Sequence, residues 1–274
     1  MRRKRAGSAL SQYLLSLLTA CLLLLSLLCA LLTMATTRTF AYAVLSASEA
    51  DSQHKIDWNA AQIQAEYGLS AETLAPLDGV CARYQAQLAD AWHDFFRTDA
   101  EAWSNHPEPL DERTMTALVM ADEGFQSRTD EDMRRAIARD EVVYPLSQMI
   151  RRCAFPIRQS LTEFAATLAA QRLSLPRLLR GVEITGAVCL MAALLLLIFC
   201  RRVRTGSTLT ATGVSALLLM LPGLLLNLPG TLHALSPIAQ TQGTRALMIL
   251  GGVQGLFAIL TLIPGILLLR RAHS

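Results

Sequence analysis

Residues 2–37 read RRKRAGSALSQYLLSLLTACLLLLSLLCALLTMATT. A basic cluster, Arg2–Arg5, precedes a run from Ala6 to Thr37 that carries no fixed charge. A transmembrane helix needs about 20 mainly apolar residues, and this run is long enough to supply them. Lys and Arg accumulate in cytoplasmic loops, so the stretch predicts a membrane span that starts from a cytoplasmic N-terminus.

Two further basic clusters, Arg201–Arg204 and Arg270–Arg271, also adjoin apolar stretches and have no acidic neighbours. Together with the first cluster they predict four transmembrane helices, with both termini in the cytoplasm and a short outer loop at about 236–245. The three later apolar stretches run from about Ile184 to Cys200, from about Leu209 to a point between Leu228 and Leu235, and from Ala246 to Leu269.

Two cleavage-site patterns compete with an uncleaved first helix. Leu18–Cys21 imitates a lipoprotein box, but the residues after Cys21 stay apolar. Ala41–Ala43 imitates a signal-peptidase site, but the apolar run is longer than the usual 7–15 residues and Arg38 separates it from the alanines. These departures favour a first helix that remains as an anchor.

The region 38–180 carries 15 basic and 21 acidic residues, a net charge of −6. This balance excludes the basic footprint of a nucleic-acid-binding domain from the only large polar region. Apolar residues recur there at helical spacing, with a candidate helix end at Gly68, a second at Gly124 and a helix start just after Pro145. There are two long stripes of this kind. The first consists of Leu77, Cys81, Tyr84, Leu88, Trp92 and Phe95. The second consists of Leu146, Met149, Ile150, Cys153, Ile157, Leu161, Phe164 and Leu168.

The predicted fold is therefore all-α: four transmembrane helices with an extracytoplasmic antiparallel helical bundle inserted between helices 1 and 2. Residues 1–37 form the cytoplasmic N-terminus and helix 1, 38–180 the outer domain, 181–269 helices 2–4 and 270–274 a cytoplasmic tail. Gly251 and Gly255, and Ser207, Ala211 and Ser215, have the spacing of small residues at contacts between membrane helices.

Cysteine usage fits this topology. Cys21, Cys29, Cys189 and Cys200 fall in or beside the apolar stretches, where cysteine behaves as a small hydrophobe. Only Cys81 and Cys153 fall in the outer region, and both lie on apolar stripes. In an oxidising compartment they are expected to form a disulfide, although two unconnected buried thiols fit the same pattern.

No family motif and no catalytic signature is recognised: there is no HExxH, GxSxG, Walker or GxGxxG loop, CxxC or EF-hand run. The five histidines are scattered, so neither a metal site nor a cofactor is predicted. The polar segment Thr98–Leu110 breaks the helical pattern and is expected to be an exposed loop. Its Trp103 and His106 are candidates for partner contact, the alternative for Trp103 being packing onto the bundle.

Glu183, His233 and Arg245 are expected at the outer membrane boundary. Ionisable groups at such a boundary either anchor helices, here through a Glu183–Arg245 ion pair, or bind a lipid headgroup or another outer-leaflet substrate. The sequence thus favours a non-enzymatic, multi-pass plasma-membrane protein of a bacterium that contacts membrane lipid and whose outer domain binds a partner protein or ligand. The alternative is an outer-leaflet enzyme that acts on a lipid or cell-wall precursor through these three residues.

Overall fold

The computed structural model describes residues 2–98, 109–127, 130–154, 159, 162–163, 166–167, 174–200, 204–226 and 237–273. Every regular element within these ranges is a helix, which confirms the all-α fold class. The chain divides into two compact units. Unit 1 comprises residues 1–37, 175–235 and 244–274, and unit 2 comprises residues 38–174 and 236–243.

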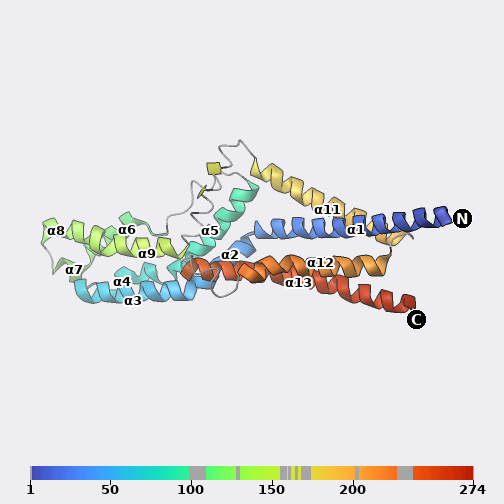
Figure 1. Cartoon of the computed structure of the whole chain (residues 1–274). Coiled ribbons are helices and arrows are strands. Elements are labelled where there is room, and N and C mark those ends of the chain that lie inside the picture. Colours follow the sequence, from blue (N-terminus) through green and yellow to red (C-terminus); the bar gives the residue numbers. More distant parts are fainter. Residues whose placement is uncertain are drawn as a thin grey trace. The chain divides into compact units, whose positions relative to one another are not determined.

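Unit 1 is built from long apolar helices (Figure 1). They are α1 (Arg2–Ala35), α11 (Leu175–Phe199), α12 (Thr205–Leu226) and α13 (Pro237–His273), whose first turns belong to unit 2. In the described ranges, three helical segments are long and apolar enough to cross a membrane: Ser11–Ala35, Leu175–Phe199 and Gln240–Arg271. A shorter apolar segment, Thr205–Leu221, lies in α12. The chain is therefore built as a membrane protein.

Glycine allows the helices of unit 1 to approach closely. A Cβ on Gly186 of α11 would lie 2.7 Å from Cβ of Cys29 in α1. A Cβ on Gly213 of α12 would lie 2.4 Å from Cγ of Leu262 in α13, and Gly265 is as tight against Thr210. Apolar burial cannot drive helices together in lipid, so such close backbone contact is a main source of their association.

The small-residue pattern was assigned to the wrong face of α12. Ala211 is exposed, whereas Thr208, Thr212 and Ala216, one position further along the chain, are buried. Gly251 and Gly255 of α13 make only ordinary contacts, with Met220. More than one face of α12 carries small residues at four-residue spacing. Because α12 is apolar around most of its circumference, the sequence could not show which of these faces packs against a neighbouring helix.

The beginning of α12 lies beside α1 and beside the end of α13. The Arg204 guanidinium stacks over the Tyr13 ring of α1 at 5.4 Å, and the Arg204 amide donates to Oγ of Ser16 at 3.2 Å. At the same end of α12, a Cβ on Gly206 would touch Leu269 of α13 at 3.1 Å. The beginnings of α1 and α12 and the end of α13 thus share one end of unit 1.

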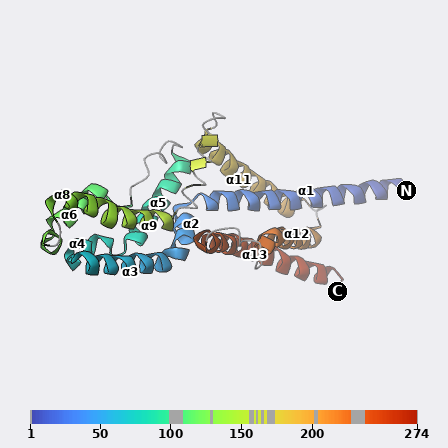
Figure 2. The same cartoon turned by 60° about the vertical axis from the view of Figure 1, so that its left-hand side comes forward.

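Unit 2 is a bundle of shorter helices, with α3 and α9 side by side in both Figure 1 and Figure 2. Its α-helices are α2 (Arg38–Leu45), α3 (Glu49–Tyr67), α4 (Ala71–Leu74), α5 (Val80–Arg97), α6 (Glu112–Ala121), α7 (Glu123–Gln126), α8 (Glu131–Ala136) and α9 (Tyr144–Cys153). Two 3₁₀ turns, Ser46–Ser48 and Ala75–Leu77, and a π-helix, Ile137–Val143, complete it.

The core of unit 2 follows the predicted stripes. Cys81, Tyr84, Leu88 and Phe95 of α5 are buried, and so are Leu146, Ile150 and Cys153 of α9. Gly68 ends α3, as the sequence indicated. Its φ of 67° lies in the left-handed region, which glycine adopts at a lower energetic cost than any residue with a Cβ. The first turn of α13 adds Gln242, which is buried and donates to Oγ of Ser48 at 3.2 Å and to the Cys153 carbonyl at 3.1 Å.

One of the expected helix boundaries is wrong and another is confirmed. Gly124 does not end α6, which ends at Ala121; it lies inside α7, where a Cβ would be 2.0 Å from the Gly68 carbonyl oxygen. Pro145 lies in the first turn of α9, so the predicted helix start there is confirmed, and the π-helix Ile137–Val143 leads directly into α9. Proline lacks an amide donor and crowds the carbonyl four residues earlier, and the wider π turns that precede Pro145 accommodate both effects.

Candidate functional site

The sequence-predicted site residues are only partly described. His233, Trp103 and His106 lie outside the described residues. Glu183 is half-buried on α11, and Arg245 is exposed on α13. Both belong to unit 1, and the expected proximity of Glu183 and Arg245 stays a prediction.

Glu183 lines a groove between α1, α11 and α13 with a volume of about 810 Å³. The groove is mostly apolar, and Glu183 is its only carboxylate among the described lining residues. Arg245 is not part of the lining. It precedes the lining residue Val253 by eight positions, about 12 Å along a helix axis. The structure thus brings one of the three boundary candidates into a cavity.

Cys81 and Cys153 meet in the core of unit 2. Both are free thiols and fully buried, and their side chains are hydrogen-bonded to each other. This hydrogen bond and burial raise the pKa of Cys153, whereas the same hydrogen bond lowers the pKa of Cys81.

We expect Cys81 and Cys153 to be bridged in protein isolated under oxidising conditions. Closing a loop of about 70 residues stabilises a fold by about 4 kcal/mol in the chain-entropy model. Denaturation with an alkylating agent and no reductant, followed by peptide mass spectrometry, should recover neither cysteine as a labelled thiol. Recovery of both as labelled thiols would reject the bridge, and Cys21 serves as an internal control for labelling.

A second polar site in unit 2 is centred on Asp122, whose side chain is buried. One carboxylate oxygen accepts from the Thr73 hydroxyl at 2.6 Å and from the Ser70 amide at 2.8 Å, and the other accepts from the Phe125 amide at 3.1 Å. Burial by itself would raise the pKa of Asp122, but these hydrogen bonds outweigh it and hold the pKa well below its ordinary value. Asp122 thus caps α7 and ties it to α4.

A pocket of about 580 Å³ opens beside this network. It is lined by Gly68, Ser70, Glu72, Thr73, Leu118, Ala121, Asp122, Glu123 and Gly124. Glu72 and Glu123 are exposed, and Leu118 presents an exposed apolar side chain from α6. The pocket combines negative charge with an apolar wall, a lining that suits a basic side chain with an apolar stem.

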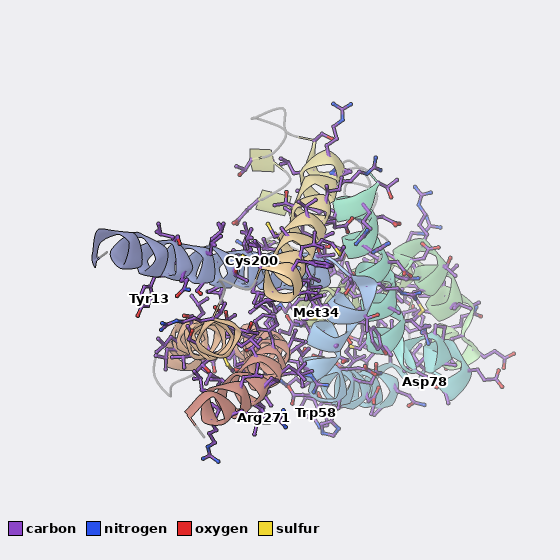
Figure 3. All side chains as sticks on the ribbon, turned by 90° about the vertical axis from the view of Figure 1, so that its right-hand side faces the viewer. Tyr13, Met34, Trp58, Asp78, Cys200 and Arg271 are labelled. Carbon is purple, nitrogen blue, oxygen red and sulfur yellow. The ribbon has the colours of Figure 1, made fainter. Side chains whose placement is uncertain are left out.

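The sequence did not reveal this pocket as a site. Its local signals, Ser70 before α4 and Asp122 before α7, indicate helix N-caps and nothing more. The elements that meet there are about 50 residues apart in the chain, so only the tertiary fold joins them. Trp58 was also missed: its side chain is 57% exposed and projects from the surface of α3 (Figure 3). No group of three potential metal ligands occurs among the described residues.

No protein-family model matches the chain, and no curated protein or solved structure shows a detectable similarity to it.

Proposed function

We propose that the chain is a multi-pass plasma-membrane protein with four spans, whose helical unit 2 is extracytoplasmic and binds a partner protein without catalysing a reaction. The observation that carries the proposal is the acidic, partly apolar pocket at the junction of α4, α6 and α7. Basic clusters at the ends of the apolar segments support the orientation.

The fourth span in this proposal is α12. Its 22 residues correspond to about 33 Å at 1.5 Å per residue, comparable with the roughly 30 Å hydrocarbon core of a bilayer. Tyr13 of α1, Arg204 beside α12 and Leu269 of α13 lie at the same end of unit 1. A chain that begins and ends on the same side of a membrane must cross it an even number of times, which supports four spans over three.

The topology has a direct test. A reporter that is active only outside the cytoplasm should be active when fused after residue 120 and inactive when fused after Ser274. A reporter active only in the cytoplasm should give the reverse pattern. An extracytoplasmic C-terminus would contradict the four-span arrangement, and three crossings would then explain the data better.

The pocket is suited to a protein partner for physical reasons. The helices that contribute its lining, α4, α6 and α7, lie at the end of unit 2 away from α2, the helix by which the chain enters the unit (Figure 1). Glu72 and Glu123 would attract a Lys or Arg side chain, and complementary charge raises the rate and specificity of association. Leu118 adds apolar area that becomes buried only when a partner is bound.

Site-specific photocrosslinking in intact cells tests this function. A photoreactive residue at Leu118 or Glu72 should give one discrete adduct, whereas the exposed Asp51, at the beginning of α3, should not. The double substitution Glu72→Lys with Glu123→Lys should abolish the Leu118 adduct, since it reverses the charge of the pocket. No adduct from the pocket, or the same adduct from Asp51, would contradict the proposal.

The outer-leaflet enzyme is less well supported. Such an enzyme needs a second group beside Glu183 that readily takes up or releases a proton near neutral pH. Among the described lining residues of its groove, Glu183 is accompanied by hydroxyl groups and a thiol but by no imidazole, guanidinium or amine.

A further inference from the structure

Arg204 and Arg270 lie at the end of unit 1 where α12 begins, and both side chains are exposed. The Arg204 guanidinium stacks on the Tyr13 ring of α1 at 5.4 Å, and it donates to no acceptor among the described residues. Within the described part of the chain, neither Arg204 nor Arg270 forms an ion pair. The sequence around them offers no counter-charge, because no Asp or Glu occurs in residues 1–37 or 184–274.

Glu183 is the only acidic residue in the segments of unit 1, and it is too distant to compensate Arg204. Gly186, one turn after Glu183 on α11, packs against Cys29 of α1, whereas Arg204 packs against Tyr13. Cys29 and Tyr13 are 16 positions apart, or about 24 Å along the axis of α1. No Asp or Glu side chain of unit 1 can therefore reach Arg204.

The packing of α12 on α13 brings the two arginines to the same level of unit 1. A Cβ on Gly206, near the start of α12, would lie 3.1 Å from both Cγ and the amide nitrogen of Leu269, near the end of α13. Arg204 is two residues before Gly206, and Arg270 directly follows Leu269. The long side chains of both arginines thus start from neighbouring points of the backbone.

The surface that adjoins these arginines is apolar. Leu17, one turn after Tyr13 on α1, is exposed, and so are Leu267 and Leu268, which precede Arg270 on α13. An occupant that satisfies both features combines negative charge with apolar chains. Phosphate matches a guanidinium, which donates two parallel hydrogen bonds to it, and phospholipid is the membrane component that joins a phosphate to apolar chains.

We propose that Arg204 and Arg270 bind the phosphate of one phospholipid with net negative charge, such as phosphatidylglycerol, whose acyl chains lie along the exposed leucines. Tyr13 is a positioning residue: it contacts the face of the Arg204 guanidinium and leaves the N–H groups at its edge for the phosphate. Phosphatidylethanolamine binds less well, because two guanidinium groups repel its ammonium group. All of these residues belong to unit 1, so the lipid site is independent of the partner pocket in unit 2.

Native mass spectrometry of the full chain, released from detergent after incubation with equal amounts of phosphatidylglycerol and phosphatidylethanolamine, tests the proposal. The wild-type chain should retain phosphatidylglycerol with a preference of about tenfold, which corresponds to about 1.4 kcal/mol. The double substitution Arg204→Gln with Arg270→Gln should abolish this preference. Arg177→Gln is the matched control: it removes an exposed guanidinium from the beginning of α11, near Glu183, and should keep the wild-type preference.

A charge-preserving variant separates a built site from general attraction between basic residues and anionic lipid. Arg204→Lys keeps the charge but loses the planar group that stacks on Tyr13 and donates two parallel hydrogen bonds, so the preference should fall about fivefold. This variant also gives the answer if the double variant fails to fold. Excess glycerol 3-phosphate should not displace the lipid, because a soluble phosphate lacks the acyl chains.

Four results would overturn the proposal. Equal retention of the two lipids by the wild type would show that the end of unit 1 does not select negative charge. A preference that survives in the double variant, or is unchanged in Arg204→Lys, would assign the attraction to the overall charge of the chain. Displacement by glycerol 3-phosphate would show that the ligand is a free phosphate and not a lipid.

Discussion

Replacing Asp122 by alanine is expected to destabilise unit 2 by about 3 kcal/mol, because buried donors that lose their acceptor cost about 1–3 kcal/mol and more when the lost partner is charged. Three donors lose their acceptor in this variant: the Thr73 hydroxyl and the amides of Ser70 and Phe125. Hydrogen exchange followed by mass spectrometry on the full chain should show faster exchange in peptides that cover α4 and α7. Asp94→Ala, at an exposed position on α5, is the control and should leave exchange unchanged.

The Asp122 contribution should also depend on pH in a defined direction. Its folded-state pKa is depressed, so its stabilisation is fully present above the unfolded value of about 3.9 and is lost as the pH falls below it. The difference in unfolding free energy between the wild type and Asp122→Ala should therefore be constant at neutral pH and shrink in acid. A difference that grows as the pH falls below 4 would show that Asp122 does not act through its charged form.

The second large effect is expected in the membrane helices. Gly213→Leu should destabilise unit 1 by about 3 kcal/mol, the upper part of the usual range for overpacking. Even a single Cβ at this position would lie 2.4 Å from Leu262, 2.8 Å from the Thr261 hydroxyl and 3.0 Å from the Ala258 carbonyl oxygen. The substitution must therefore force α12 and α13 apart.

Thermal unfolding in detergent, followed by the loss of monodisperse protein, measures this effect. Gly252→Leu is the matched control: the same substitution in α13, at an exposed glycine where a Cβ meets nothing within 4 Å. The unfolding temperature should fall for Gly213→Leu and stay close to the wild-type value for Gly252→Leu. Equal unfolding temperatures for the two variants would contradict the close contact between α12 and α13.

Features of the fold that depend on local chemistry could be predicted from the sequence. The length of the apolar run that ends at Thr37 indicates α1, and the spacing of the α5 stripe indicates its buried face. Gly68 marks the end of α3 because the left-handed backbone conformation there depends on one residue. The helical spacing of the apolar residues is sufficient to predict the all-α fold class.

Features that depend on distant contacts could not be predicted. Gly124 has the sequence pattern of a helix end. In the fold, glycine is needed there because a Cβ would clash with the carbonyl oxygen of Gly68, 56 positions away in the chain. The residues around Asp122 indicate only a helix N-cap, and its hydrogen bonds with Ser70 and Thr73 depend on the tertiary fold. At the candidate sites, the sequence selected Glu183 and the pair Cys81 and Cys153, because a charge at a membrane boundary and two outer thiols stand out. Neither the groove nor the pocket has a local signature.

The π-helix at Ile137–Val143 has a consequence for how chain length can vary in this protein. In an α-helix, removing one residue rotates everything downstream by about 100°, which would turn Leu146 and Ile150 out of the core. A π turn contains one residue more than an α turn, so loss of a single residue between 137 and 143 would return the segment to α-helical winding and preserve the orientation of both flanks. This short stretch is where the bundle can become one residue shorter and still bury the same side chains.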